Sequence, residues 1–156
     1  MRRYLIYVDS SVVGGCEDQE FAEDSRRLWD TFTSGQHTMA VSRLMIREIA
    51  EAPEAVRMHL KSVPPGNQIV IEDTDETREL AQAYMDRGIL GEGSRSDAEH
   101  VALATVAGVD LLASWNFKHL VNLGRIRLFN AVNMERGYGT IEIRMPKEVL
   151  DNEEDL

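Results

Sequence analysis

The chain has 156 residues, 43% of them hydrophobic, and a formal net charge of −10 at pH 7. This length suits one domain built on one core. The acidic balance argues against a protein that grips nucleic acid through a broad basic face, because Lys and Arg contacts to phosphate supply much of that affinity. Part of the charge is local, since residues 148–156 contain five acids and no base. We therefore predict a domain over 1–147 and a solvated acidic C-terminal tail over 148–156.

The cysteine count, the first residues and the length of the apolar runs bear on the compartment and on membrane contact. Cys16 is the only cysteine and has no partner for an internal disulfide. Arg2 and Arg3 precede only five apolar residues, which does not resemble a secretory signal. No stretch approaches the ~20 apolar residues that a membrane-spanning helix needs. We expect a soluble, cytoplasmic protein without membrane contact.

Short apolar runs of β-forming residues alternate with segments whose apolar residues recur at helical spacing. The predicted strands are residues 4–8, 37–42, 68–72, 109–114 and 140–144. The predicted helices are residues 17–32, 43–52, 53–62, 73–88 and 96–108, with one more before the last strand. Helical connections between strands favour parallel pairing through right-handed crossovers. The predicted fold class is an α/β three-layer sandwich with a central parallel sheet flanked by helices.

Capping residues mark several of these helices. Ser42, Thr74 and Ser96 stand where a side chain can accept a hydrogen bond from the first helical turn. Gly88 and Gly108 follow the last apolar residue of their helices and are predicted to end them.

Oxygen-bearing side chains lie at the ends of the predicted strands and on the helices that follow them. Asp9 follows the first strand, Asp97 begins the helix over 96–108, and Asn116 follows the fourth strand. Glu48 lies beside the apolar face of its helix, where an unpaired carboxylate is costly. Ligands of parallel α/β sheets bind at the carboxyl edge, so we expect these four groups to meet there. Such a cluster of like charges requires a hard cation, for which Mg²⁺ or Mn²⁺ is suited.

Four segments resemble the PIN domain family, and most closely its bacterial stand-alone VapC-type toxins. They read YVDSSV, SRLMIREI, SDAEHVALATVAGVDLLASWNFKHL and IRMPKEVL, and the resemblance covers nearly the whole chain. It implies a magnesium- or manganese-dependent endoribonuclease with a central parallel sheet. By this resemblance, Asp9, Glu48 and Asp97 match the acidic metal-binding positions, and Ser11 matches a small hydroxyl residue near the first acid.

One position departs from the family pattern. Asn116 stands where many members have a fourth aspartate, which leaves three acids and weakens the case for two tightly held metal ions. Two interpretations of Asn116 remain open: a contact to metal or substrate, and a local turn cap.

Each of the three acids also has a local explanation that does not involve a metal ion. Asp9 can be a turn or cap residue, and Asp97 can simply favour the positive end of its helix dipole. Glu48 can be a surface residue paired with Arg47 or Arg43 if the helix phase differs from the one predicted.

The resemblance implies hydrolysis of RNA phosphodiester bonds with the metal as organiser. Glu48 or Asp97 is the candidate that orients or deprotonates the attacking water. Arg95, Lys118 and Arg43 are the basic residues nearest by sequence that can steer the RNA backbone.

The resemblance implies the toxin ribonuclease of a type II toxin–antitoxin pair, with an RNA substrate, a cognate antitoxin and a homodimer as expected partners. The alternative is a catalytically weakened PIN-like module that acts by binding RNA or protein. A haloacid-dehalogenase phosphatase is disfavoured because Ser11 stands where that family has a second aspartate, and a response-regulator receiver because the early chain lacks an acidic pair. His100 and His119 lack zinc-ligand spacing and are predicted to be structural. Asp110 is expected at the far end of its strand.

Overall fold

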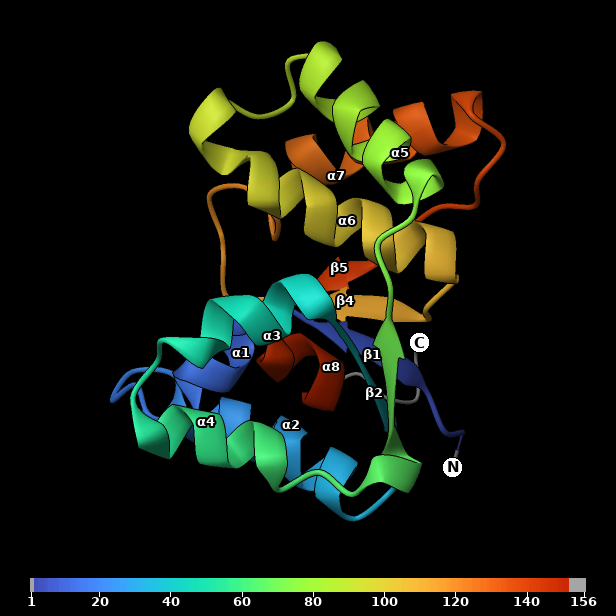
Figure 1. The fold of residues 1–156 in the computed structure, drawn as a ribbon. Coiled ribbons are helices and arrows are strands. Elements are labelled where there is room, and N and C mark those ends of the chain that lie inside the picture. Colours follow the sequence, from blue (N-terminus) through green and yellow to red (C-terminus); the bar gives the residue numbers. More distant parts are fainter. Residues whose placement is uncertain (1, 152–156) are drawn as a thin grey trace.

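The computed structural model describes residues 2–151 of the chain. Its centre is a five-stranded sheet in the order β3-β2-β1-β4-β5, and every pairing is parallel. The strands are β1 (Leu5–Val8), β2 (Thr38–Ser42), β3 (Gln68–Ile71), β4 (Leu111–Ala113) and β5 (Ile143–Arg144). Helices cover both faces of the sheet (Figure 1), which confirms the predicted three-layer α/β sandwich.

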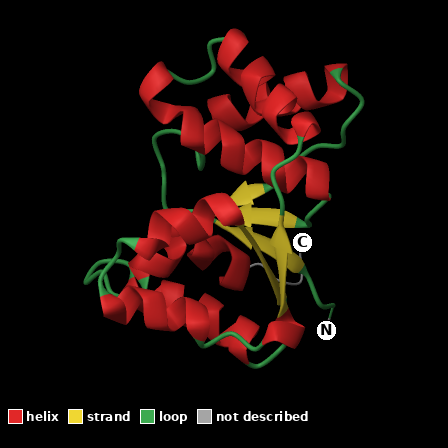
Figure 2. Cartoon of the chain, viewed as in Figure 1, coloured by secondary structure: helices red, strands yellow, loops and turns green. Residues whose placement is uncertain are grey.

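The two faces of the sheet are covered by different sets of helices. The layer drawn above the sheet contains α5 (Asp75–Asp86), α6 (Arg95–Ala107) and α7 (Leu123–Glu135). The other side contains α1 (Ser10–Gly15), α2 (Ala22–Thr33), α3 (Arg43–Ala50), α4 (Glu54–Lys61) and α8 (Pro146–Asp151). Figure 2 shows the yellow strands enclosed between these red helices.

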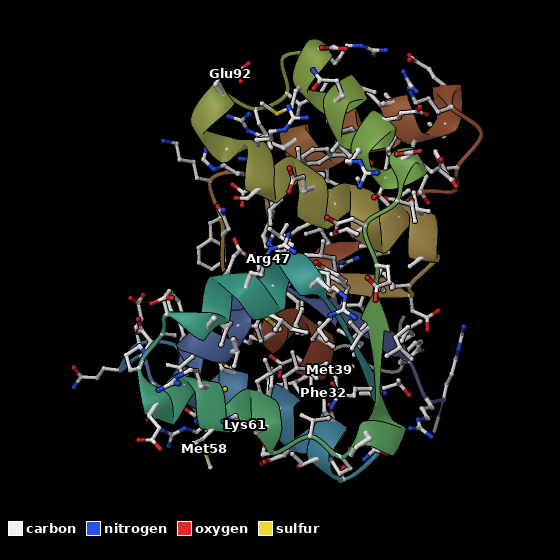
Figure 3. All side chains as sticks on the ribbon, in the orientation of Figure 1. Phe32, Met39, Arg47, Met58, Lys61 and Glu92 are labelled. Carbon is white, nitrogen blue, oxygen red and sulfur yellow. The ribbon has the colours of Figure 1, made fainter. Side chains whose placement is uncertain are left out.

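Each face of the sheet has its own hydrophobic core, because successive side chains of a strand point to opposite faces. In β1, Tyr7 belongs to the core under α5, α6 and α7, whereas Ile6 and Val8 belong to the core on the other side. Figure 3 shows Phe32 and Met39 inside this second core.

Local signals in the sequence locate most helix ends. The Ser42 hydroxyl accepts a hydrogen bond from the Met45 amide at 3.1 Å, so the predicted cap of α3 is confirmed. Thr74 caps α5, while Gly88 and Gly108 follow α5 and α6 with φ of 73° and 67°. The predicted cap at Ser96 is wrong, because α6 already begins at Arg95 and its first turn has no side-chain cap.

Three elements differ from the sequence-based expectation. Helix α1 follows Asp9 directly and was not predicted, and β5 has only two of the five residues expected over 140–144. The predicted solvated tail begins inside α8, which packs against α2 and buries Val149 completely. The apolar residues of this acidic segment are too few to produce a recognisable helical periodicity, so the sequence did not predict the helix. Residues 152–156 of that tail lie outside the described residues.

Within residues 2–151, the structure has no helix that is both long enough and apolar enough to span a bilayer.

Candidate active site

The order of the strands creates a switch point beside β1. The chain passes from β1 to β2 and β3 on one side, and then crosses over to β4 and β5 on the other. In open α/β sheets, ligands bind at such a point, outside the carboxyl ends of the strands. Asp9 follows β1 and Ser114 follows β4, so both lie at this point.

Asp9 is fixed there by hydroxyl groups from two strand ends. Its carboxylate accepts hydrogen bonds from the Ser11 hydroxyl at 2.5 Å and from the Ser114 hydroxyl at 2.7 Å. It also caps α1 by accepting a hydrogen bond from the Ser11 amide at 3.1 Å. The interpretation of Asp9 as a cap residue is therefore confirmed. Only 4% of Asp9 is exposed, and this burial raises the pKa of its carboxyl group.

Glu48 is held by a buried chain of polar groups. The Ser42 hydroxyl lies 2.7 Å from the Tyr7 hydroxyl, which lies 2.6 Å from Nδ1 of His100. His100 Nε2 lies 2.7 Å from Oε1 of Glu48, and His100 itself is only 2% exposed. With His100 Nε2 protonated, each group in the series from Met45 N–H to Glu48 can donate to the next.

The pairing of Glu48 with Arg43 or Arg47 is thereby excluded, although Glu48 is itself an exposed residue. Arg43 pairs with Glu72 at 2.8 Å and Arg47 lies 3.9 Å from Asp73, so neither arginine is the partner of Glu48. The helix phase deduced from the sequence is correct, because Glu48 turns toward α6 and reaches a buried histidine.

Asp97 lies in the first turn of α6 and contacts the loop that follows β4. Its Oδ2 atom lies 3.1 Å from Nδ1 of His119 and 3.4 Å from Nδ2 of Asn116. Nδ1 of His119 also lies 3.3 Å from the Ser94 hydroxyl. Asp97 is therefore more than a helix-start acid, since these contacts come from a segment about 20 residues further along the chain.

His100 hydrogen-bonds to Glu48 and also feels the charges of Asp9 and Asp97. Burial would lower its pKa, but the hydrogen bond to Glu48 and the negative charges of Asp9, Glu48 and Asp97 outweigh burial and raise the pKa. Asp9 in turn has its pKa raised mainly by burial and in smaller part by the charge of Asp97. The structure thus brings the three predicted acids into one electrostatic neighbourhood between β1, α3 and α6.

The donor chemistry fits Mg²⁺ or Mn²⁺, although the carboxylates do not form a finished ligand cage. No group of three or more His, Cys, Asp or Glu side chains in the described part of the chain is arranged to hold a metal ion. Two oxygens nevertheless accept no hydrogen bond from residues 2–151, namely Oε2 of Glu48 and Oδ1 of Asp97. Each of these acids therefore has one oxygen fixed by the protein and one left for another ligand.

Asn116 is a turn cap, which is one of the two interpretations left open by the sequence. Its side-chain oxygen accepts the His119 amide at 2.9 Å and so caps a turn, while its amide nitrogen faces Asp97. The atom nearest the acids is therefore a donor rather than a metal-ligating oxygen.

The predicted substrate residues have different surroundings. The Ser11 hydroxyl donates to Asp9 and accepts the Trp115 amide at 2.9 Å, so it links two parts of the site. Arg95 lies 3.6 Å from Glu99 on the same helix. Lys118 is exposed and forms no ion pair with any of residues 2–151.

Three further contributors were not assigned to the site from the sequence. His100 and His119 are structural in the sense predicted, because they order side chains, but the groups they order are Glu48 and Asp97. Ser114 lies two residues before Asn116 in the sequence, and its contact with Asp9 joins residues 105 positions apart. Such contacts depend on tertiary packing, and no local pattern reveals them.

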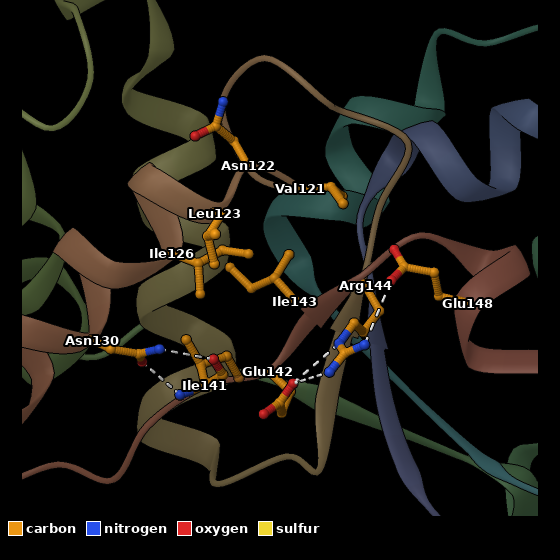
Figure 4. A pocket seen from close by; sticks show the side chains of 10 residues that line it. All are labelled: Val121, Asn122, Leu123, Ile126, Asn130, Ile141, Glu142, Ile143, Arg144 and Glu148. Carbon is orange, nitrogen blue, oxygen red and sulfur yellow. Dashed lines mark hydrogen bonds and ion pairs between the residues drawn. The ribbon is translucent and has the colours of Figure 1, made fainter. Parts of the chain in front are cut away.

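A separate pocket lies away from these acids. It has a volume of about 470 Å³ and lies between the start of α7 and β5. Figure 4 shows Ile126 and Ile143 pointing into it, and Arg144 at its rim paired with Glu142 and Glu148. None of the predicted site residues lines this pocket.

Comparisons with known proteins identify the fold. No protein-family model matches the chain, and no curated protein sequence does either. Among solved structures, VapBC2 of Rickettsia felis, bound to a DNA fragment from its promoter, matches with 12% identity over 90% of this chain and 98% of that one, at a TM-score of 0.55. The sarcin-ricin-loop-cleaving toxin VapC20 of Mycobacterium tuberculosis matches with 17% identity over 88% and 98%, at a TM-score of 0.56. The chain therefore has a PIN/VapC-like fold.

Proposed function

We propose that this protein is a metal-dependent endoribonuclease, the toxin of a type II toxin–antitoxin pair. The observation that carries the proposal is that Glu48 hydrogen-bonds His100 and that the charges of Asp9 and Asp97 act on the same histidine, at the switch point of a VapC-like sheet. Each acid has protein partners that orient it, but the mutual repulsion of the acids and the burial of Asp9 both oppose folding, so their proximity favours a bound cation.

Mg²⁺ or Mn²⁺ is the proposed cofactor, with Asp9, Glu48 and Asp97 as its ligands. When bound, such an ion offsets negative charge on the phosphate and makes water more acidic. The hydroxyls of Ser11 and Ser114 keep Asp9 oriented, and His119 keeps Asp97 oriented. Glu48 and Asp97 are both candidates for the base, because a histidine anchors one oxygen of each while Oε2 of Glu48 and Oδ1 of Asp97 are available to take a proton from water.

Specific contacts also favour a second function, that of a module with a weakened site that binds RNA or protein. Asn116 carries no charge and directs its amide nitrogen at Asp97. The described carboxylates also lack a three-residue ligand arrangement. This alternative predicts binding without cleavage.

Cleavage of single-stranded RNA in Mn²⁺ and in EDTA separates the two functions. We expect cleavage by the wild-type protein in Mn²⁺, none in EDTA and none by the Asp97→Asn variant in either. RNA binding without cleavage in Mn²⁺ would favour the weakened module. Cleavage that persists in EDTA would contradict the metal-dependent mechanism.

The partners in this proposal are an RNA substrate, a cognate antitoxin and a second copy of the chain, all in the cytoplasm. The Rickettsia felis structure contains a toxin of the same fold with its antitoxin, which supports the antitoxin as a partner. Sedimentation of the purified chain, alone and with the product of an adjacent gene, tests the homodimer and the antitoxin together.

Asn116→Asp should tighten Mn²⁺ binding and lower the melting temperature of the metal-free protein. The new carboxylate can still cap the turn at His119, but it replaces a donor 3.4 Å from Asp97 with a like charge. The matched control is Asn122→Asp, because Asn122 also caps a turn of backbone, at the start of α7 and outside the acid cluster. Calorimetric titration and melting in EDTA measure both effects. If Asn116→Asp changes neither quantity more than the control does, Asn116 takes no part in the site.

A further inference from the structure

Three aromatic rings form a cluster beside the acids, and the proposed chemistry does not use them. Phe21 stacks on Trp115 with ring centroids 4.4 Å apart and an interplanar angle of 23°. Phe117 approaches Trp115 at 6.0 Å and Phe21 at 6.3 Å, at steep angles of 75° and 60°. No ring of the described residues is stacked flat on Phe117, and 46% of this residue is exposed.

Two of the three rings come from the segment whose side chains contact Asp9 and Asp97. In residues 114–119, Ser114 binds Asp9, and Asn116 and His119 contact Asp97. The residues between them, Trp115 and Phe117, supply two of the three rings.

Trp115 is clamped in place rather than loosely packed. Its backbone amide donates to the Ser11 hydroxyl at 2.9 Å, and its indole Nε1 donates to the Ser25 hydroxyl at 2.8 Å. The backbone of Gly15 also passes close by, since a Cβ there would lie 2.5 Å from the Ser25 hydroxyl and 3.0 Å from the indole nitrogen. Trp115 therefore has a fixed position relative to Asp9, which Ser11 also contacts.

One basic residue beside the cluster is available to a nucleotide. Lys118, next to Phe117, is exposed and has no ion pair within residues 2–151, so it is available to a phosphate. Glu17, in the loop before Phe21, is already paired with Arg26 at 2.9 Å and with His59 at 2.8 Å. Asp18 and Glu20 of the same loop are exposed and form no ion pair within residues 2–151, so Lys118 is the charge beside the rings that favours RNA.

We propose that Phe117, supported by Trp115 and Phe21, is a stacking platform for a base of single-stranded RNA next to the cleaved phosphodiester. Aromatic side chains bind unpaired bases by stacking, whereas the bases of a duplex are already stacked on one another. The platform thus selects single-stranded RNA and places its backbone between Lys118 and the acids. This inference rests on the proposed function, because that function puts the phosphodiester at Asp9 and Asp97.

Quenching of tryptophan fluorescence by a single-stranded oligouridylate in EDTA tests the platform without cleavage. Trp29 is buried at 3% exposure, so Trp115 is the indole that a base near Phe117 can reach. Phe117→Ala is expected to weaken binding about fivefold to a hundredfold, the range measured for loss of one stacked base. Phe117→Tyr should restore binding. The control Leu128→Ala removes a side chain that is 47% exposed on α7 and should have no effect.

A strand of the same length without bases is expected to bind wild-type protein about as weakly as the normal strand binds Phe117→Ala. Equal binding by Phe117→Ala and wild type, or equal binding of the two strands, would overturn the platform. So would quenching by an oligoarginine peptide but not by RNA, because the rings would then be a protein-docking surface.

The cleavage assay in Mn²⁺ keeps this inference separate from the proposed function. Cleavage that is indifferent to Phe117 overturns the platform alone. Base-dependent binding at Phe117 without cleavage by wild type overturns the nuclease and supports base stacking on Phe117 in an RNA-binding module. A protein that neither binds nor cleaves the strand contradicts both.

Discussion

Replacement of Asp9 by asparagine is expected to reduce metal-dependent RNA cleavage by about a thousandfold or more, and yet to raise the melting temperature of the metal-free protein at neutral pH. Cleavage falls because a proposed ligand loses its charge. Stability rises because a carboxylate that is 4% exposed and close to Asp97 no longer has to be buried as an anion. Asparagine preserves the volume and can still bond to Ser11 and Ser114. Cleavage rates and melting curves in EDTA measure the two effects.

The stability gain should depend on pH in a defined direction. Burial raises the pKa of Asp9, so the unfolded chain ionises at lower pH than the folded protein does. Between the ordinary pKa of aspartate and the raised value, stability is lost as pH increases, and the loss is complete above the raised value. Asp9→Asn should therefore be more stable than wild type only above the ordinary pKa.

Asp110→Asn is the matched control for this prediction. Asp110 precedes β4 and accepts the Leu5 amide at 2.8 Å, at the opposite end of the sheet, as predicted from the sequence. Its replacement should leave cleavage unchanged. Equal loss of cleavage in the Asp9 and Asp110 variants would mean that net charge, and not the site, is responsible.

His100→Leu is expected to destabilise the protein by about 2–3 kcal/mol and to reduce cleavage about tenfold to a hundredfold. Leucine removes the partner of Glu48 and leaves the buried Tyr7 hydroxyl with Ser42 alone. Glu48 then loses its fixed orientation, which lowers cleavage independently of stability. Urea unfolding and cleavage rates well below the melting temperature separate these effects.

A pair of tyrosine variants distinguishes positioning from general destabilisation. Tyr7→Phe deletes one hydroxyl from the chain that reaches Glu48, at a cost of about 1 kcal/mol. Tyr84→Phe deletes an equally buried hydroxyl, whose partner is Asn133 between α5 and α7. Only Tyr7→Phe should reduce cleavage. Similar losses of cleavage in both variants would make the Tyr7–His100 contact merely structural.

The fold was predictable because its signals are local. The apolar run of β1, the cap at Ser42 and the stop at Gly108 each depend on a few neighbouring residues, and each was placed correctly. Helix α8 was missed because its contact with α2 rests on buried residues such as Val149 within an acidic stretch. The acidic residues of this segment obscure its helical pattern, and the helix is stabilised by packing against α2 instead.

The positions of the acids were predictable, but their supports were not. Asp9 follows from the strand that precedes it, and Glu48 from its place beside an apolar helix face. The contact between His100 and Glu48 joins residues 52 positions apart, and the stacking of Phe21 on Trp115 joins two separate loops. Pairings of this kind leave no periodic trace in one sequence.

Calorimetric titration of Mn²⁺ tests most directly whether the three acids form one metal site. Wild-type protein is expected to bind Mn²⁺, and Asp9→Asn, Glu48→Gln and Asp97→Asn should each weaken binding about tenfold or more, while Asp110→Asn should not. A wild-type protein that binds no Mn²⁺, or acid variants that bind it as tightly as wild type, would contradict the shared site.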